Sequence, residues 1–434
     1  MSPPPSTALK IRRLPWAIAS GACNAVFGSL TFGGSVFVLF LDCLGLPKSR
    51  IGLVLSLFPF CGLLAIPFGL VVGRFGAKRA WITCFALRNL VILLLILAPL
   101  VVHHGGTSAA ATYVTAVMLV FAVLRAVGET GYYPWFREFC PDFIRGRFSA
   151  AQMIVATICS AISLWIAGYV IGHSQGAGGF QILIAVGAVF GLASVAAMLW
   201  VPGGAPFDDP SGWGGYWHKV VSSLRHRDFR LYLGGMGLYV LGAAPFAFVP
   251  LFMRDSVGLS SVSVVRLEMA ALLGGVCSSF FVGRASDRYG GKKVMLLGTL
   301  AVAVLPIVWI WMPRHSPWSG PLAYAAASWW GIANAAVGIG GVRLVFSEMI
   351  PIDKAMGYSS VYYAFSGLIG GIGPLTVGWA LAGTAGLQGR LGGLNLDSYT
   401  PLFAVSVILI LASVAMYRAI GRVARPPGTN EATP

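Results

Sequence analysis

Twelve long apolar runs restrict the fold of this 434-residue chain more than any other feature. One α-helix crosses the hydrocarbon core of a bilayer with about 20 apolar residues, whereas a transmembrane β-barrel shows segments of about ten residues that alternate apolar and polar side chains. The alternating pattern is absent, so the sequence predicts an all-α membrane protein with twelve transmembrane helices. The runs lie at residues 15–41, 51–73, 80–102, 108–135, 148–171, 180–201, 230–253, 262–283, 294–313, 321–349, 356–382 and 399–420.

The basic side chains fall mostly on one side of the predicted membrane. Lys and Arg total 30 against 14 Asp and Glu, a surplus that nucleic-acid-binding proteins also show. If the N-terminus is cytoplasmic and the crossings alternate, 21 of the 30 basic residues lie on the inner side. The outer side holds only Lys48, Arg50, Arg254, Arg314 and Arg390. This asymmetry is the orientation signal of a membrane protein with many crossings, and it makes a nucleic-acid partner unnecessary.

The same pattern predicts the location of the protein. We expect an integral protein of the cell membrane with both termini in the cytoplasm. The loops are short and no Asn-x-Ser/Thr sequence occurs, which favours a bacterial inner membrane.

No catalytic or cofactor motif stands out. The seven cysteines are scattered without a Cys-x-x-Cys pair, which predicts neither a zinc site nor a disulfide framework. The six histidines fall in loops or at interfaces, and a phosphate-binding loop of P-loop spacing is absent. We therefore expect a protein that is not an enzyme and that holds no metal or cofactor.

One phrase occurs twice in the chain. Residues 69–79 read GLVVGRFGAKR, and residues 283–293 read GRASDRYGGKK. At an offset of 214 residues, the recurring positions are Gly69 and Gly283, Arg74 and Arg288, Gly76 and Gly290, and Lys78 and Lys292. Two further landmarks recur at offsets of 213 and 210 residues, namely Asp42 as Asp255 and Glu138 as Glu348. The chain is therefore a doubled six-helix unit.

The duplication divides the chain into two halves of like orientation. Each half has an even number of crossings, so both enter from the same side and are related by an axis along the membrane normal. We predict an N-terminal six-helix bundle at 1–201, a cytoplasmic linker at 202–229, and a C-terminal six-helix bundle with a short cytoplasmic tail at 230–434, the bundles being related by pseudo-twofold symmetry. The linker ends in WHKVVSSLRHRDFR, which is either an amphipathic helix on anionic headgroups or a plain connector.

These features resemble the major facilitator superfamily (MFS) of secondary transporters over essentially the whole chain. The repeated phrase is similar to that family's signature Gly-x-Leu-Ala-Asp-Arg-x-Gly-Arg-Lys between helices 2 and 3, with a weaker copy between helices 8 and 9. In the family, the acid and the Arg of the signature hold the two halves together on the cytoplasmic side. The resemblance assigns these roles to Asp287 and Arg288, whereas the first copy departs from it because Gly73 stands in place of the acid.

The resemblance implies a gate at these loops. We expect Glu138 and Glu348 to pair with loop arginines, and Gly69 and Gly283 to permit close helix contact. The alternative is that the cationic loops only set the orientation. The candidate gating residues are Gly69, Arg74, Gly76, Lys78, Glu138, Gly283, Asp287, Arg288, Gly290, Lys292 and Glu348.

Charges that break the repeat are candidates for a substrate site. Arg125, Glu129 and Arg88 have no charged counterpart in the second half. An ionisable group at membrane depth costs at least about 2.5–3.5 kcal/mol on insertion scales, so these side chains should face the protein interior or a wet cavity. Counted from an inner boundary near Phe136, Arg125 lies about 16 Å up its helix, and Glu129 lies one turn away on the same face.

Two interpretations of these charges are open. Either Arg125 binds an anionic part of the substrate while Glu129 competes for it by taking up a proton, or the two form a permanent structural bridge. Arg88 is likewise either a further substrate contact or a buried structural residue.

The resemblance also places helices 1, 4, 7 and 10 around a central cavity. On these helices we prefer Asn24, Tyr239 and Asn334 as lining residues, although an Asn can simply join helices and a Tyr can anchor at the membrane interface. Arg266 and Glu268 lie near the outer interface on different faces of one helix, and we expect both to snorkel.

The predicted function is secondary active transport of a small solute by alternating access. The unrepeated Arg125 favours an organic anion or zwitterion, and H⁺ is the expected coupling ion. A lipid or drug exporter of the same fold and a non-transporting membrane sensor are the alternatives. We expect a monomer whose further partners are membrane lipids.

Overall fold

The computed structural model describes residues 6–64, 68, 72, 74–206, 224–349, 355–387, 389–391 and 394–421. The elements of the N-terminal half are α1 (Thr7–Thr31), α2 (Gly34–Cys43), α3 (Lys48–Gly62), α5 (Ala77–Val91), η1 (Ile92–Leu97), α6 (Ala98–Phe139), η2 (Asp142–Ile144), α7 (Arg145–His173) and α8 (Gly178–Leu199). Those of the C-terminal half are α10 (Arg227–Ala243), η3 (Ala244–Phe248), α11 (Val249–Asp255), α12 (Ser261–Tyr289), α13 (Gly291–Ile310), α14 (Ser319–Arg343), η4 (Leu344–Met349), α15 (Ala355–Gly383), β1 (Gly389–Leu391), β2 (Leu394–Leu396) and α16 (Thr400–Ala419).

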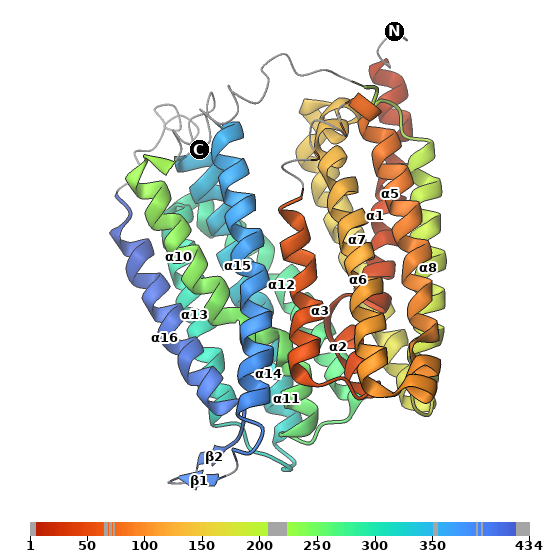
Figure 1. The fold of residues 1–434 in the computed structure, drawn as a ribbon. Coiled ribbons are helices and arrows are strands. Elements are labelled where there is room, and N and C mark those ends of the chain that lie inside the picture. The colour runs from red at the N-terminus through yellow and green to blue at the C-terminus, as the bar shows by residue number, and fades with distance from the viewer. Residues whose placement is uncertain are drawn as a thin grey trace.

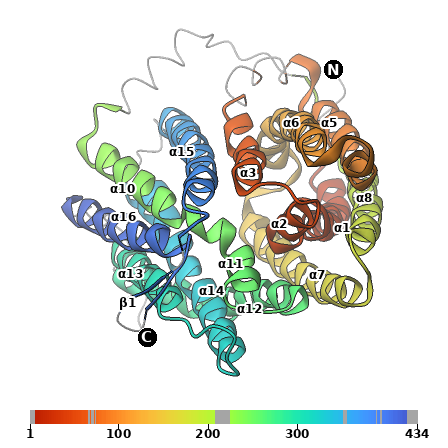
Figure 2. The ribbon, with the colours of Figure 1, turned by 60° about the horizontal axis from the view of Figure 1, so that its bottom comes forward.

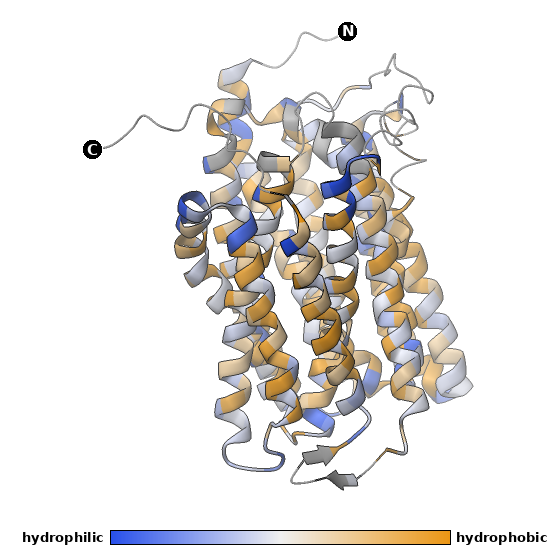
Figure 3. Cartoon of the chain, turned by 90° about the vertical axis from the view of Figure 1, so that its left-hand side faces the viewer, coloured by the Kyte–Doolittle hydropathy of each residue, from blue (hydrophilic) through white to orange (hydrophobic). Residues whose placement is uncertain are grey.

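The helices of the two halves form two bundles that stand side by side. The N-terminal elements, red to yellow in Figure 1, lie on one side, and the C-terminal elements, green to blue, lie on the other. Figure 2 shows the same division after a turn that brings the bottom of the molecule forward. Apolar residues cover most of the length of the helices in Figure 3. The predicted two-bundle helical membrane fold is confirmed, whereas the domain bounds stay a prediction because residues 207–223 of the linker lie outside the described chain.

Nine stretches of the described chain are helical, long enough and apolar enough to cross a membrane. The longest, Ala77–Tyr132, has 56 residues and contains two antiparallel arms, because the chain reverses at Gly106 (φ 75°, ψ 179°). Across this turn, the hydroxyl of Tyr113 donates to the carbonyl oxygen of Leu94 at 2.8 Å. The two arms, together with α3 and α14, occupy the apolar runs predicted at 80–102, 108–135, 51–73 and 321–349.

A short β-hairpin before α16 is a small addition to the predicted all-α fold. Strands β1 and β2 pair antiparallel with Leu391 opposite Leu394, so two residues connect them. The hairpin lies beyond the helix ends at the bottom of Figure 1. Strands of three residues do not disturb the pattern of apolar runs, which is why that pattern did not reveal them.

The repeated phrase builds the same corner in both bundles. Gly76 (φ 100°) precedes α5, and Gly290 (φ 90°) joins α12 to α13. Side chains other than that of glycine rarely tolerate this left-handed backbone conformation. The repeat therefore preserves a sharp turn between consecutive helices.

The repeated lysines cap the C-terminal end of the last helix in each bundle. Nζ of Lys78 donates to the carbonyl oxygens of Leu199 and Val201 at the end of α8, at 2.8 and 2.7 Å. Nζ of Lys292 donates in the same way to two carbonyl oxygens at the end of α16, at 3.1 and 2.5 Å. Unpaired carbonyl groups and the negative end of the helix dipole both attract a cation there. The duplicated phrase thus holds the outer helices of each bundle together.

Replacement of either lysine is expected to destabilise its own bundle. Lys78→Met and Lys292→Met should each lower the free energy of unfolding by about 1–3 kcal/mol, because carbonyl groups lose a charged hydrogen-bond donor. Thermal unfolding of the purified protein in detergent measures the effect. Lys293→Met is the control, since the neighbouring Lys293 is exposed. Equal stability of all three variants would contradict the capping role.

Candidate functional site

The molecule has two chemically different ends. The basic turns at Gly76 and Gly290 lie at one end, with the start of α5 and the end of α16, at the top of Figure 1. We call it the basic end. The opposite end holds the turn between α2 and α3, the turn between α11 and α12, and the β-hairpin. We call it the latch end.

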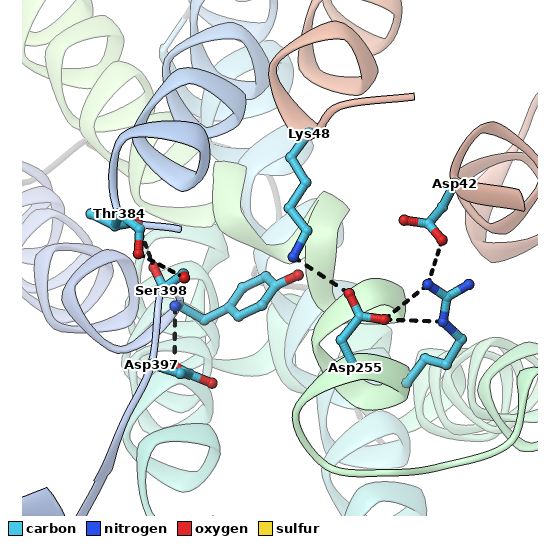
Figure 4. Close-up of polar contacts among 8 residues, drawn as sticks. Asp42, Lys48, Asp255, Thr384, Asp397 and Ser398 are labelled. Carbon is cyan, nitrogen blue, oxygen red and sulfur yellow. Dashed lines mark hydrogen bonds and ion pairs between the residues drawn. The ribbon is translucent and has the colours of Figure 1, made fainter. Parts of the chain in front are cut away.

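Ion pairs join the two bundles at the latch end. Arg254 of α11 donates from Nη2 to Oδ2 of Asp42 on α2, in the other bundle, and to Oδ1 of Asp255 at 2.8 Å. Nζ of Lys48, at the start of α3, lies 3.4 Å from Oδ2 of Asp255. Figure 4 shows the carboxylate of Asp255 between Lys48 and the guanidinium group that binds Asp42. These four side chains form one network across the bundles, which we call the latch.

The sequence singled out each latch residue for a separate reason and did not predict that they contact one another. Asp42 and Asp255 marked the repeat, and Lys48 and Arg254 were counted among the outer cations. The shared offset of the two acids, with Gly45 and Gly258 at the same offset, related the two halves at this end of the sequence.

Close backbone contacts lie beside the latch. A Cβ atom on Gly52 of α3 would lie 3.0 Å from Cα of Gly378 and 2.4 Å from the carbonyl oxygen of Pro374, both on α15. Small residues permit this approach of two helices. In α2, residues 36–41 are at most 3% exposed, as expected of a helix enclosed on all sides. The two bundles are therefore closed against each other at the latch end.

A large cavity opens between the bundles toward the basic end. Its volume is about 910 Å³, and α7, α12 and α14 line it from Glu268 to Asp287 and Arg343. Asn334, a predicted lining residue, is exposed on its wall. Gly283 also lines it, and a Cβ there would meet no described atom within 4 Å. The close helix contact predicted for Gly283 is therefore absent, because the bundles are apart at this end.

Arg125 and Glu129 form the ion pair that their spacing predicts. Nε of Arg125 lies 2.8 Å from Oε1 of Glu129 on α6, and the two side chains are 32% and 48% exposed. The guanidinium carbon lies 5.9 and 6.0 Å from the ring centres of Phe32 and Phe58. Both side chains of the pair are thus partly exposed.

Arg88 and Asn24, two further predicted site residues, contact each other. Nη2 of Arg88 donates to Oδ1 of Asn24. Arg88 is only 1% exposed, and its guanidinium carbon lies 3.7 Å from the ring centre of Phe85 and 5.1 Å from that of Phe27. A solute does not reach so enclosed a side chain. The geometry favours the structural interpretation of Arg88, in which it joins α5 to α1.

Tyr239 lies in the core of the C-terminal bundle. It packs against the cluster that contains Val302, Ala333 and Ile410. Its hydroxyl is buried and has no hydrogen-bond partner within the described residues. The structure thus gathers Asn24 with Arg88 and Arg125 with Glu129 in one bundle, and leaves Tyr239 and Asn334 in the other.

The candidate gating residues lie at the basic end. Asp287 accepts a hydrogen bond from Nη1 of Arg343 within the C-terminal bundle. Oε2 of Glu138 accepts from the backbone N–H of Gly204, at the start of the predicted linker, at 2.6 Å. The guanidinium carbon of Arg288 lies 5.4 Å from the ring centre of the next residue.

Other gating predictions are only partly covered by the structure. Arg74 is exposed, two residues before the turn at Gly76 that precedes α5. Gly69 and the side chain of Glu348 lie outside the described part of the chain. A gate at the basic end concerns the conformation that is closed there, so it stays a prediction.

The prediction that Glu268 snorkels at the outer interface is wrong. Its Oε2 accepts hydrogen bonds from the N–H and from the hydroxyl of Ser35 at the start of α2, each at 2.6 Å. Arg266 is exposed, and residues two apart lie about 200° apart around a helix. The helical period showed that Arg266 and Glu268 lie on different faces of the helix. Nothing in the sequence showed which of these faces packs against the other bundle.

Comparison with known proteins agrees with this architecture. A family model described as Major Facilitator Superfamily matches residues 18–374, whereas no curated protein matches the sequence. The solved structure of the nucleoside transporter NupG is similar at a TM-score of 0.67 and 18% identity, over 94% of this chain and 99% of that chain. A bacterial homologue of the human lysosomal transporter Spinster, inward-facing and unoccupied, has a TM-score of 0.68 and 13% identity, over 98% and 100% of the two chains.

A third similar structure is that of a D-xylose-proton symporter, with a TM-score of 0.62 and 14% identity, over 95% of this chain and 98% of that chain. At these identities the three structures show the fold alone. The family model, however, covers most of the chain, including the first copy of the repeated phrase and the second. The chain therefore belongs to the major facilitator superfamily.

Proposed function

We propose that this protein is a secondary active transporter that moves a small organic anion or zwitterion by alternating access. Membership of a family of transporters supports transport itself. The observation that carries the substrate class is the accessible Arg125–Glu129 pair. Arg125 has a carboxylate partner on its own helix, so a carboxylate or phosphate group of a solute can replace that partner without moving the backbone.

Glu129 supplies a means of coupling transport to H⁺. When Glu129 takes up a proton its negative charge disappears, and Arg125 is then left to bind the anionic group of the solute. When the solute leaves, the carboxyl group releases its proton and pairs with Arg125 again. One anion at Arg125 and one proton at Glu129 are thereby bound together and released together, which supports proton-coupled transport.

We place the basic end in the cytoplasm, because cytoplasmic loops of membrane proteins carry the excess of Lys and Arg. The described conformation is then open to the inside and closed to the outside by the latch. In the opposite conformation the bundles close at the basic end, where Arg74, Asp287, Arg288 and Glu138 are available as gate residues. The protein acts as a monomer in the lipid of an inner membrane.

Reconstitution tests the substrate site. A thermal-shift screen of the purified protein against organic acids, amino acids, nucleosides and pentoses selects a solute, and its uptake into proteoliposomes is then measured under an imposed pH gradient. Arg125→Ala is expected to reduce uptake about tenfold or more, because loss of a charge partner in a partly buried site costs upwards of about 1.4 kcal/mol. Glu129→Gln is expected to retain solute exchange and to lose uptake driven by the pH gradient.

Arg266→Ala is the matched control, since Arg266 is an exposed arginine on a different helix, α12. Uptake by this variant should equal uptake by the native protein. Unchanged uptake in both Arg125→Ala and Glu129→Gln would refute the site while leaving the fold intact. Absence of saturable flux for every solute that shifts the melting temperature would favour the sensor alternative.

A further inference from the structure

A second cavity lies between the bundles, between the basic-end cavity and the latch. Its volume is about 300 Å³, and the C-terminal bundle supplies most of its wall, from η3, α11, α12, α13 and α14. The N-terminal bundle contributes Gly34, Ser35, Val38 and Leu55. The two cavities share Glu268, Ala271 and Trp330 in their walls, so they are adjacent. We call the second the inner cavity.

Glu268 is the charged residue in the wall of the inner cavity, and the other lining residues are uncharged. Ser35 donates both of its hydrogen bonds to Oε2. No described residue donates to Oε1, which lies against the backbone of Gly34, where an added Cβ would be only 1.9 Å away. The carboxylate is thereby fixed at the start of α2 with one oxygen able to accept further hydrogen bonds. A carboxylate oxygen binds a cationic hydrogen-bond donor more strongly than a neutral one.

Three aromatic rings form one corner of the inner cavity. The ring centre of Phe246 lies 4.6 Å from that of Trp309 and 4.9 Å from that of Trp330, at interplanar angles of 83° and 78°. Faces of such rings also stabilise a neighbouring cation. Trp309 is 4% exposed, and its indole N–H is buried without an acceptor in the described chain. Buried donors are nearly always paired in native proteins, and Trp309 lines the inner cavity, so a ligand there is a candidate acceptor for this N–H.

We propose that the inner cavity binds a compact aromatic amine that carries a hydrogen-bond acceptor. The ammonium group pairs with Glu268, the apolar body fills the aromatic corner, and the acceptor takes the N–H of Trp309. The occupant touches both bundles, because Ser35 belongs to one and Glu268 to the other. It therefore binds while the latch end is closed, stabilises that conformation and inhibits transport. The site is separate from the anion site proposed at Arg125 and does not depend on it.

Calorimetric titration with three small probes tests the charge and the acceptor on the native protein. Tyramine carries both groups, tyrosol has a hydroxyl in place of the ammonium, and phenethylamine lacks the phenol oxygen. Tyramine is expected to bind about tenfold or more tightly than tyrosol, since a partly desolvated charge pair distinguishes them. It is also expected to bind more tightly than phenethylamine. Equal affinities of tyramine and tyrosol would overturn the proposal without any variant being needed.

Variants then locate the site. Glu268→Gln is expected to abolish the preference for tyramine over tyrosol while keeping the affinity for tyrosol, and Trp309→Phe is expected to abolish the preference over phenethylamine. Arg125→Ala should bind tyramine as the native protein does. Tyramine binding that survives in Glu268→Gln but is lost in Arg125→Ala would place the amine at the other site and refute the assignment. Tyramine that fails to increase the population closed at the latch end would refute the inhibitory role.

Discussion

In the Arg254→Met variant, the latch end of the molecule is expected to open. Arg254 is shared by two acids from opposite bundles, Asp42 and Asp255, so its removal replaces an attraction by a repulsion. The latch side chains are 21–31% exposed, and water screens part of the effect. We expect the closed state to lose about 1–2 kcal/mol, which changes the ratio of the two conformations about 5- to 30-fold.

Distances between spin labels measure this opening. Gln175, between α7 and α8, and Pro317, before α14, are exposed positions at the latch end of opposite bundles. In a background whose seven native cysteines are replaced, labels at these positions should show a longer distance component in Arg254→Met than in the native protein. The longer component is the population that is open at the latch end.

A second arginine provides the control for the first. Nη1 of Arg314 lies 2.9 Å from Oδ2 of Asp397, an ion pair at the same end of the molecule but within the C-terminal bundle. Arg314→Met should lower the melting temperature and leave the distance between the bundles unchanged. If both variants open the latch end equally, loss of stability and not loss of the latch explains the opening.

The architecture was predictable because it depends on local patterns. The length of an apolar run sets a crossing whatever its neighbours are, and the glycines at positions 76 and 290 mark turns through their own backbone requirements. The role of the repeated lysines was not predictable in this way. The acceptors of Lys78 and Lys292 lie 121 to 128 residues further along the chain, and the lysine spacing contains no information about them.

The candidate site shows the same division between local and distant contacts. Arg125 and Glu129 pair within one helix turn, so helical spacing predicts the contact. Asn24 and Arg88 are 64 residues apart, and the sequence supplied both residues but not their pairing. Helical period tells which side chains share a face and not which face meets another helix. For that reason Glu268, whose partner is 233 residues away, was assigned to the lipid interface.

Gly52→Ala is expected to shift the conformational balance as strongly as loss of the latch. The space around a new Cβ is occupied by backbone, namely the carbonyl oxygen of Pro374 at 2.4 Å and Cα of Gly378 at 3.0 Å. Backbone atoms within a helix do not rotate away, so α3 and α15 must separate to admit one methyl group. Overpacking of this kind costs about 1–3 kcal/mol. This cost destabilises the conformation that is closed at the latch end, because the contact between α3 and α15 joins the two bundles there.

Gly62→Ala on the same helix is the matched control. A Cβ on Gly62 would meet no described atom within 4 Å, and alanine favours a helix over glycine by about 1 kcal/mol, so this variant should keep the native label distances and uptake. Gly378→Ala should reproduce the effect of Gly52→Ala from the other bundle, since its Cβ would lie 2.7 Å from the carbonyl oxygen of Lys48. If Gly52→Ala keeps the native distances and uptake, the helices tolerate separation here, and closure at the latch end depends on the ion pairs alone.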